Sequence, residues 1–90
     1  MDRTIWKFPI KVEDEQSVSM PYDSQLLHVG MQGDDVCIWA LVNPSAHRVE
    51  RIIHIFGTGH PLPDDPGVYV GTFMLASGVL VFHVFVAWEA

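Results

Sequence analysis

Residues 79–88 read Val-Leu-Val-Phe-His-Val-Phe-Val-Ala-Trp, and this stretch decides the fold. Its side chains alternate between two faces that are both apolar, with Val79, Val81 and Phe85 on one and Leu80, Phe82, Val84, Val86 and Trp88 on the other. Ten residues are too few to cross a bilayer as a helix, and β-branched and aromatic residues favour a strand. A strand apolar on both faces is typical of the centre of a sandwich or barrel, or of a subunit interface.

Turn signals on either side of this stretch organise the rest of the chain into hairpins. Ala76-Ser77-Gly78 joins it to a preceding strand over residues 68–75. A second hairpin is predicted over residues 26–31 and 36–42, joined by Gln32-Gly33-Asp34-Asp35. Gly33 supplies the positive φ that such a turn needs.

Three further strands are predicted over residues 4–12, 16–20 and 48–56. Residues 4–12 alternate between apolar and polar side chains, and Pro9 indicates an edge strand or a bulge because it has no N–H to donate. Only residues 43–49 would accommodate a helical turn. The sequence therefore predicts one all-β domain over residues 1–90, a small antiparallel sandwich or partly open barrel of six to seven strands.

The composition leaves more apolar side chains than a small core needs. Hydrophobic residues make up 49% of the 90-residue chain and charged residues only 18%. The surplus must lie on the surface, where a second copy of the chain is the simplest cover, so a homodimer is expected.

The charge argues against nucleic acid as a direct partner. The net charge is −6, and the bases are Arg3, Lys7, Lys11, Arg48 and Arg51, with none after residue 51. Binding to phosphates needs clustered lysines and arginines. An acidic surface instead suits a basic protein partner.

The single cysteine and the N-terminus bear on the compartment. Cys37 has no second cysteine to pair with, which suits a reducing compartment. Residues 1–12 carry charges where the apolar part of a signal peptide would lie. Neither a secretory signal nor a membrane segment is predicted.

The loop over residues 57–67 is the candidate ligand site. Its Gly57-Thr58-Gly59-His60 segment offers backbone amides as a nest for an anion, a hydroxyl and an imidazole, and Arg48 and Arg51 are the nearest bases in the sequence. The alternative is a stiff crossover loop, in which glycines make sharp turns and prolines restrict the backbone. A lone Gly-Thr-Gly does not decide between these readings.

The sequence contains no pattern of residues that indicates metal binding or catalysis. Asp64 and Asp65 are adjacent on a turn, which suits solvated side chains better than ligands of one ion. Strand residues His28, His54 and His83 would form a zinc site only if their strands were neighbours, and otherwise they are ordinary half-buried imidazoles. Cys37 lies in an apolar strand, and no serine stands in a nucleophile motif. No enzyme activity, cofactor or metal is therefore predicted.

The last strand supplies candidates for an interface. Phe82, Phe85 and Trp88 are large aromatic residues, a class enriched at binding hot spots.

Several segments together resemble a family of small uncharacterised proteins from tailed phages and prophages. These segments are Ile5-Trp6-Lys7-Phe8-Pro9, Trp39-Ala40-Leu41-Val42, Gly57-Thr58-Gly59-His60, Gly71-Thr72-Phe73 and Leu80-Val81-Phe82-His83-Val84-Phe85. The resemblance implies a phage origin and the bacterial cytoplasm as its setting, and it supplies no catalytic residues.

The function expected in that setting is binding. The first expectation is an inhibitor of a host protein, such as a defence protein, acting by protein–protein contact. The alternatives are a sponge for a small anionic signalling ligand and a minor structural protein of the phage particle.

Overall fold

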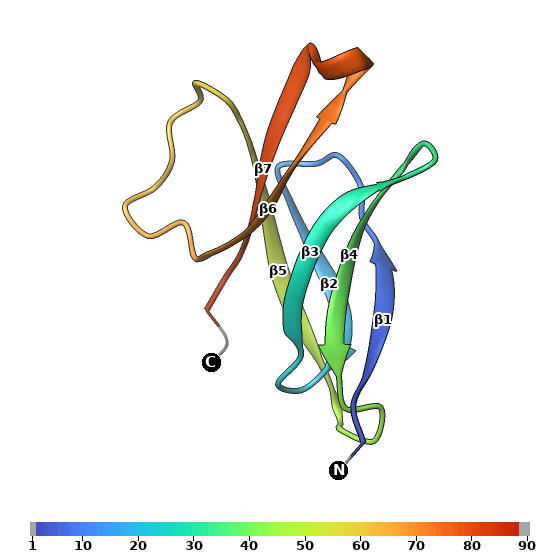
Figure 1. Ribbon diagram of the computed structural model, residues 1–90. Helices are drawn as coiled ribbons and strands as arrows, with labels where there is room; N and C mark the ends of the chain where they lie inside the picture. Colours follow the sequence, from blue (N-terminus) through green and yellow to red (C-terminus); the bar gives the residue numbers. More distant parts are fainter. Residues whose placement is uncertain (1, 89–90) are drawn as a thin grey trace.

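The computed structural model describes residues 2–88, which form seven strands and one short 3-10 turn (Figure 1). The elements are β1 (Thr4–Pro9), β2 (Glu15–Pro21), β3 (Gln25–Gln32), β4 (Asp35–Val42), β5 (Arg48–Gly57), β6 (Val68–Leu75), η1 (Ala76–Gly78) and β7 (Leu80–Val86). Within the described residues, no helix has the length and apolarity to cross a membrane.

The strands form two antiparallel sheets. One sheet has the order β1-β4-β3 and the other the order β2-β5-β7-β6. The sheets approach most closely where β3 meets β6, because a Cβ placed on Gly71 would lie only 3.1 Å from the Cβ of Val29. The predicted all-β fold is confirmed as an open, sandwich-like arrangement of seven strands.

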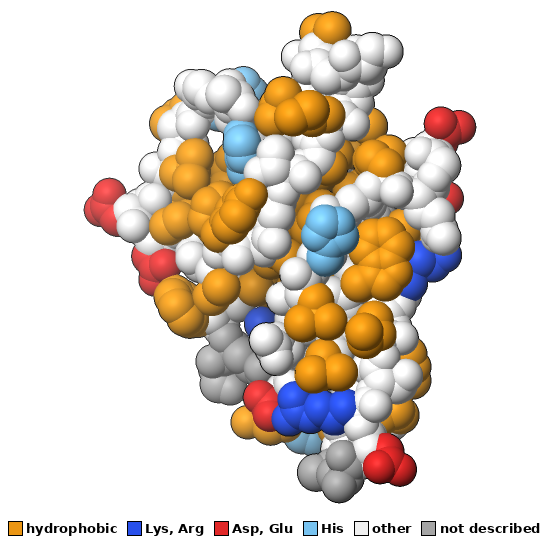
Figure 2. Space-filling view, viewed as in Figure 1, with side chains coloured by type: hydrophobic (Ala, Val, Ile, Leu, Met, Phe, Trp, Pro, Cys, Tyr) orange, Lys and Arg blue, Asp and Glu red, His pale blue; other side chains and the backbone are white. Residues whose placement is uncertain are grey.

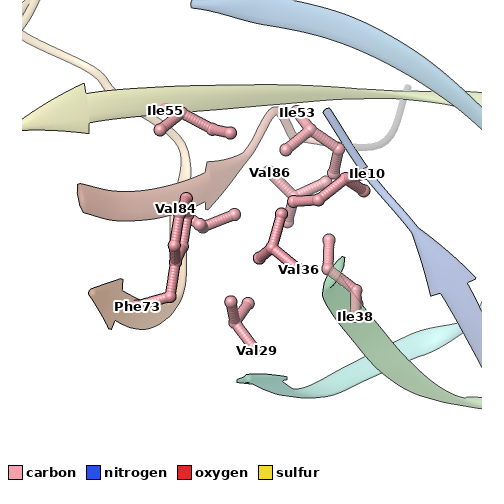
Figure 3. Close-up of a cluster of buried hydrophobic side chains, with 9 residues drawn as sticks. All are labelled: Ile10, Val29, Val36, Ile38, Ile53, Ile55, Phe73, Val84 and Val86. Atoms are coloured by element: carbon pink, nitrogen blue, oxygen red, sulfur yellow. The ribbon is translucent and has the colours of Figure 1, made fainter. Parts of the chain in front are cut away.

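The core lies between the two sheets. Ile53 and Ile55 of β5 and Val84 and Val86 of β7 point inward because alternate residues of a strand share a face. They meet side chains from the other sheet, and Figure 3 shows the whole cluster: Ile10, Val29, Val36, Ile38, Ile53, Ile55, Phe73, Val84 and Val86. A second buried cluster consists of Phe8, Met20, Ala40 and Val42.

Both predicted hairpins are present, β3–β4 and β6–β7. Gly33 has a φ of 60°, as the turn chemistry predicted. Pro9 lies on β1, which is an edge strand, as also predicted. Residues 43–47 form a turn closed by the Ala46 amide and the Asn43 carbonyl, 3.1 Å apart, and contain no helix.

The first strand is shorter than the alternation predicted, since β1 ends at Pro9 and Val12 is exposed. The side chain of Gln16 explains this end. It accepts from the Lys11 amide at 2.9 Å and donates to the Lys11 carbonyl at 2.6 Å, so it satisfies the backbone of the turn. The last strand likewise runs from Leu80 to Val86, shorter at both ends than residues 79–88.

A long crossover connects β5 to β6. Both strands pair antiparallel with β7, so they run parallel to each other with β7 between them. Residues 58–67 must therefore return along the length of the sheet, and in Figure 1 they swing out on the left, away from the three-stranded sheet. This connection brings loop residues to the outer side of β7.

Candidate functional site

The outer face of the four-stranded sheet carries a row of side chains that crosses all four strands in register. Glu15 of β2 pairs with His54 of β5, His54 pairs with Phe85 of β7, and Phe85 pairs with Tyr69 of β6. With adjacent strands about 4.8 Å apart, the row is about 14 Å long. It presents three rings in sequence and a carboxylate at one end.

Rings within and beside this row contact one another. The ring of Phe85 lies between those of Tyr69 and Phe56, edge to face with both, at centroid distances of 5.5 and 5.7 Å. His54 stacks on Phe56 at 6.1 Å. We call these four residues, His54, Phe56, Tyr69 and Phe85, the aromatic face. Tyr69 is 56% exposed and the other three are half-buried, so the rings remain accessible.

A chain of hydrogen bonds fixes one end of the aromatic face. The Tyr69 hydroxyl lies 2.6 Å from the Thr72 hydroxyl, which lies 3.0 Å from Nδ1 of His83. Nε2 of His83 lies 2.7 Å from the hydroxyl of Thr58 in the crossover loop. We call these residues the His83 network. It joins β6, β7 and the loop, and it holds the Tyr69 ring in one position.

A neutral His83 satisfies this network completely. If Nε2 carries the proton, Tyr69 donates to Thr72, Thr72 donates to Nδ1 and Nε2 donates to Thr58. The Thr58 hydroxyl also lies 3.5 Å from the Val81 carbonyl. A threonine beside a histidine is the start of a nucleophile–base pair, but the group at Nδ1 here is a hydroxyl and not the carboxylate that would stabilise an imidazolium. The geometry therefore suits a structural role.

The Gly57–His60 segment is a turn whose polar groups serve the fold. The His60 amide donates to the Gly57 carbonyl at 3.1 Å, and Gly59, third in the turn, has a φ of 88°, as a type II turn requires. The Thr58 amide donates to the Val81 carbonyl at 3.1 Å. In the Gly57–His60 segment expected to form an anion nest, the amides of Thr58 and His60 are thus hydrogen-bonded within the chain.

The structure does not bring Arg48 and Arg51 to this loop. Along β5, Arg51 lies six residues from Gly57 and Arg48 nine, which is about 20 and 30 Å of strand. Arg48 donates from Nε to the Ser19 hydroxyl at 2.9 Å and from its guanidinium to the Ser19 carbonyl at 2.6 Å. Arg51 faces inward, is 8% exposed and donates to the Ser24 carbonyl at 3.2 Å.

The three predicted interface residues lie in three different surroundings. Phe82 faces inward, stacks on Phe73 at 5.4 Å and packs, partly buried, against the core. Phe85 is central to the aromatic face. Trp88 is 66% exposed, and its Nε1 donates to both carboxylate oxygens of Asp65, at 2.9 and 3.1 Å. Asp65 also accepts from the Gly67 amide at 3.1 Å. Its hydrogen bonds therefore connect the crossover loop to the segment that follows the last strand.

The three strand histidines do not converge. His28 lies on the outer face of the three-stranded sheet beside Trp39, with ring centroids 6.1 Å apart, whereas His54 and His83 share the outer face of the other sheet. Nδ1 of His54 is 3.7 Å from Glu15. Among residues 2–88, no three histidine, cysteine or acidic side chains gather closely enough to hold a metal ion.

Comparison with known proteins identifies the family and nothing more specific. A domain of unknown function, DUF7352, matches residues 1–90. The chain belongs to the DUF7352 family. The family's description names no ligand, partner or reaction. Comparisons with curated proteins and with solved structures gave no match.

Two hollows adjoin the sites described for this DUF7352 chain. One, of about 420 Å³, is lined by the Gly57–His60 turn and the start of β7: Gly57, Thr58, His60, Val79, Leu80, Val81 and Phe82. The other, of about 350 Å³, lies near Trp88 and the opposite end of β5: Tyr22, His47, Val49, Glu50, Arg51, Ile52, Ala87 and Trp88. Arg51 and the Gly57–His60 turn thus belong to different hollows.

Sequence reasoning missed Tyr69, Thr72 and Phe56 and saw no network around His83. A local signal existed for one contact, because a hairpin turning at residues 76–78 pairs Leu75 with Leu80 and therefore Thr72 with His83. The Phe56–Phe85 contact had no such signal, since β5 and β7 are separated by the whole of the crossover and β6.

Proposed function

We propose that this chain is a non-catalytic binding module that engages another protein through the aromatic face. The observation that carries the proposal is the in-register row of Glu15, His54, Phe85 and Tyr69, which leaves accessible rings on the outside of a sheet. Rings kept at the surface do not add to the core, and a group of them on one face is typical of a binding site.

The rigidity of the rings supports this role. Phe85 packs edge to face between Phe56 and Tyr69, and the His83 network holds the Tyr69 hydroxyl. A binding surface that is already ordered loses less conformational entropy when a partner arrives.

The finer proposal is a phage-encoded inhibitor of a host protein, such as a defence protein, acting in the bacterial cytoplasm. Its support is the resemblance of five segments to phage and prophage proteins, together with the small size and the net charge of −6. A sponge for a small anion has less support, because the amides of Thr58 and His60 donate within the fold and both arginines lie far along β5.

The proposal includes a homodimer formed by the other outer face. On the three-stranded sheet, Ile5 pairs with Leu41, and Trp39 pairs with both Lys7 and His28. Figure 2 shows hydrophobic side chains with a histidine among them over β1, β3 and β4. A second copy packed on this face would cover these side chains and leave the aromatic face free for a different partner.

The proposal is tested by capture from lysate of the bacterial host with immobilised protein. We expect the wild type to retain one host protein. We expect each of the two single variants, Tyr69→Leu and Phe85→Leu, to lose it. Tyr22→Leu is the matched control, because Tyr22 is also exposed but lines the hollow near Trp88. Equal retention by all variants contradicts the proposal, as does native mass spectrometry in which a small molecule is the only bound species.

A further inference from the structure

We infer that the aromatic face receives a positively charged side chain, an arginine or lysine of a basic segment in the partner. The inference rests on the proposed function and adds the chemistry of the partner. It is based on the residues of the row, in which the rings of Tyr69, Phe85 and His54 are followed, on the next strand, by the carboxylate of Glu15. Ring faces attract cations through their quadrupole, and a carboxylate at the end of the row adds an ion pair.

Of the strands that carry this row, only β5 contains bases, Arg48 and Arg51, and both lie toward the end of β5 away from Gly57. No lysine or arginine follows Arg51, so the crossover loop, β6 and β7 contain none. Arg48, on β5, lies at the far end of the strand and donates to Ser19. Arg51, also on β5, faces inward and donates to the Ser24 carbonyl. Arg3 and Lys7 contact Asp23 and Gln32, and Lys11 lies between β1 and β2.

Carboxylates lie toward both edges of the sheet that carries the aromatic face. The Glu15 side chain is 66% exposed on β2, one edge of the sheet. Asp64 and Asp65 lie in the loop that leads into β6, the other edge, where Asp65 accepts from Trp88 and from the Gly67 amide. A face of rings between acidic margins, on a chain of net charge −6, is complementary to a cationic segment and repels an acidic one.

The geometry favours a guanidinium in particular. Its planar group stacks on a ring face and still donates sideways to a carboxylate. Neighbouring residues of the row lie about 4.8 Å apart. A guanidinium placed over His54 therefore has the Phe85 ring on one side and the Glu15 carboxylate on the other.

The test uses two peptides and nuclear magnetic resonance of the intact protein. One peptide alternates glycine with arginine, and the other replaces each arginine with citrulline, which has nearly the same shape without the charge. We expect the arginine peptide to shift the ring resonances of Phe85 and Tyr69, and the citrulline peptide to bind about tenfold more weakly or not at all. Tyr69→Leu, Phe85→Leu and Glu15→Gln should each weaken the arginine peptide about threefold or more, while Tyr22→Leu should not.

The outcomes separate this inference from the proposed function. If the citrulline peptide binds equally well at the same rings, the inference of a cationic partner is wrong. The proposal that the aromatic face binds a protein is unaffected by that result. Binding of the arginine peptide that survives both leucine variants, or no shift of the rings with either peptide, also overturns the inference. The proposed function itself is tested separately, because it fails if host-protein capture is insensitive to Tyr69→Leu and Phe85→Leu.

Discussion

Thr72 and His83 face each other across the β6–β7 hairpin, with the Thr72 hydroxyl 3.0 Å from Nδ1 of the imidazole. This contact is the centre of a chain that starts at Tyr69 on the aromatic face and ends at Thr58 in the crossover loop. The surface proposed to bind a partner and the loop that was the sequence's candidate ligand site are therefore coupled through one histidine.

The first prediction concerns this coupling. Thr72→Val should lower the free energy of unfolding by about 1 kcal/mol, because it removes the partner of a half-buried imidazole nitrogen. It should also broaden the distribution of Tyr69 ring positions. Urea denaturation measures the first effect and ring resonances of Tyr69 the second. Thr4→Val, at the exposed start of β1, is the matched control, and equal effects of both substitutions contradict the account.

The second prediction compares two glycines of the crossover loop. Gly59 and Gly67 have φ values of 88° and 93°, but only at Gly67 would a Cβ meet backbone, 2.3 Å from the Val86 carbonyl oxygen. Gly59→Ala should lower the free energy of unfolding by about 1 kcal/mol, because alanine is strained at a positive φ although its Cβ would contact nothing. Gly67→Ala should cost about 2–4 kcal/mol, since the end of the last strand must also shift. Similar melting temperatures for the two variants would show that the loop does not dock on β7 in this way.

The third prediction tests the inner face of β5. Ile53→Ala should lower the free energy of unfolding by about 2–5 kcal/mol, because Ile53 is fully buried between the sheets. Leu62→Ala, at a position 45% exposed in the crossover loop, should change it by less than about 0.5 kcal/mol. Chemical denaturation of both variants provides the measurement, and a small effect at Ile53 is incompatible with the sandwich core.

The fourth prediction concerns the proposed homodimer. Ile5→Asp should dissociate it without unfolding the chain, because the new carboxylate would be buried against the second copy. Val79→Asp, at a position 79% exposed near the tip of the last hairpin, should leave the dimer intact. Sedimentation velocity distinguishes the two variants. A wild-type protein that sediments as a monomer at all concentrations rules out this part of the proposal.

Local patterns in the sequence were sufficient for the strands and the hairpins. Alternation placed Phe82 and Val84 on one face of the last strand and Phe85 on the other, and the structure adds that the first two face inward and Phe85 outward. Gly33 marked a turn that the structure contains. These features depend on neighbours in the chain, which is why a single sequence predicts them.

The candidate site depended on pairings between distant strands, which alternation does not reveal. The row from Glu15 to Tyr69 needs the order β2-β5-β7-β6 and the register of three strand pairs. Nearness in sequence also misled the ligand hypothesis, because Arg51 is six residues from Gly57 but shares the inward face with Ile53. A long extended strand separates residues that a helix or a turn would keep together.

The most direct test of the aromatic face as the binding surface is site-specific photo-crosslinking in the bacterial host. The photo-reactive residue p-benzoylphenylalanine replaces Tyr69 in one variant and Tyr22 in the other, two exposed tyrosines on different parts of the molecule. The account predicts that illumination joins a host protein to the variant at position 69 and not to the one at position 22. Crosslinking at position 22 alone, equal crosslinking at both positions, or none at position 69 would contradict it.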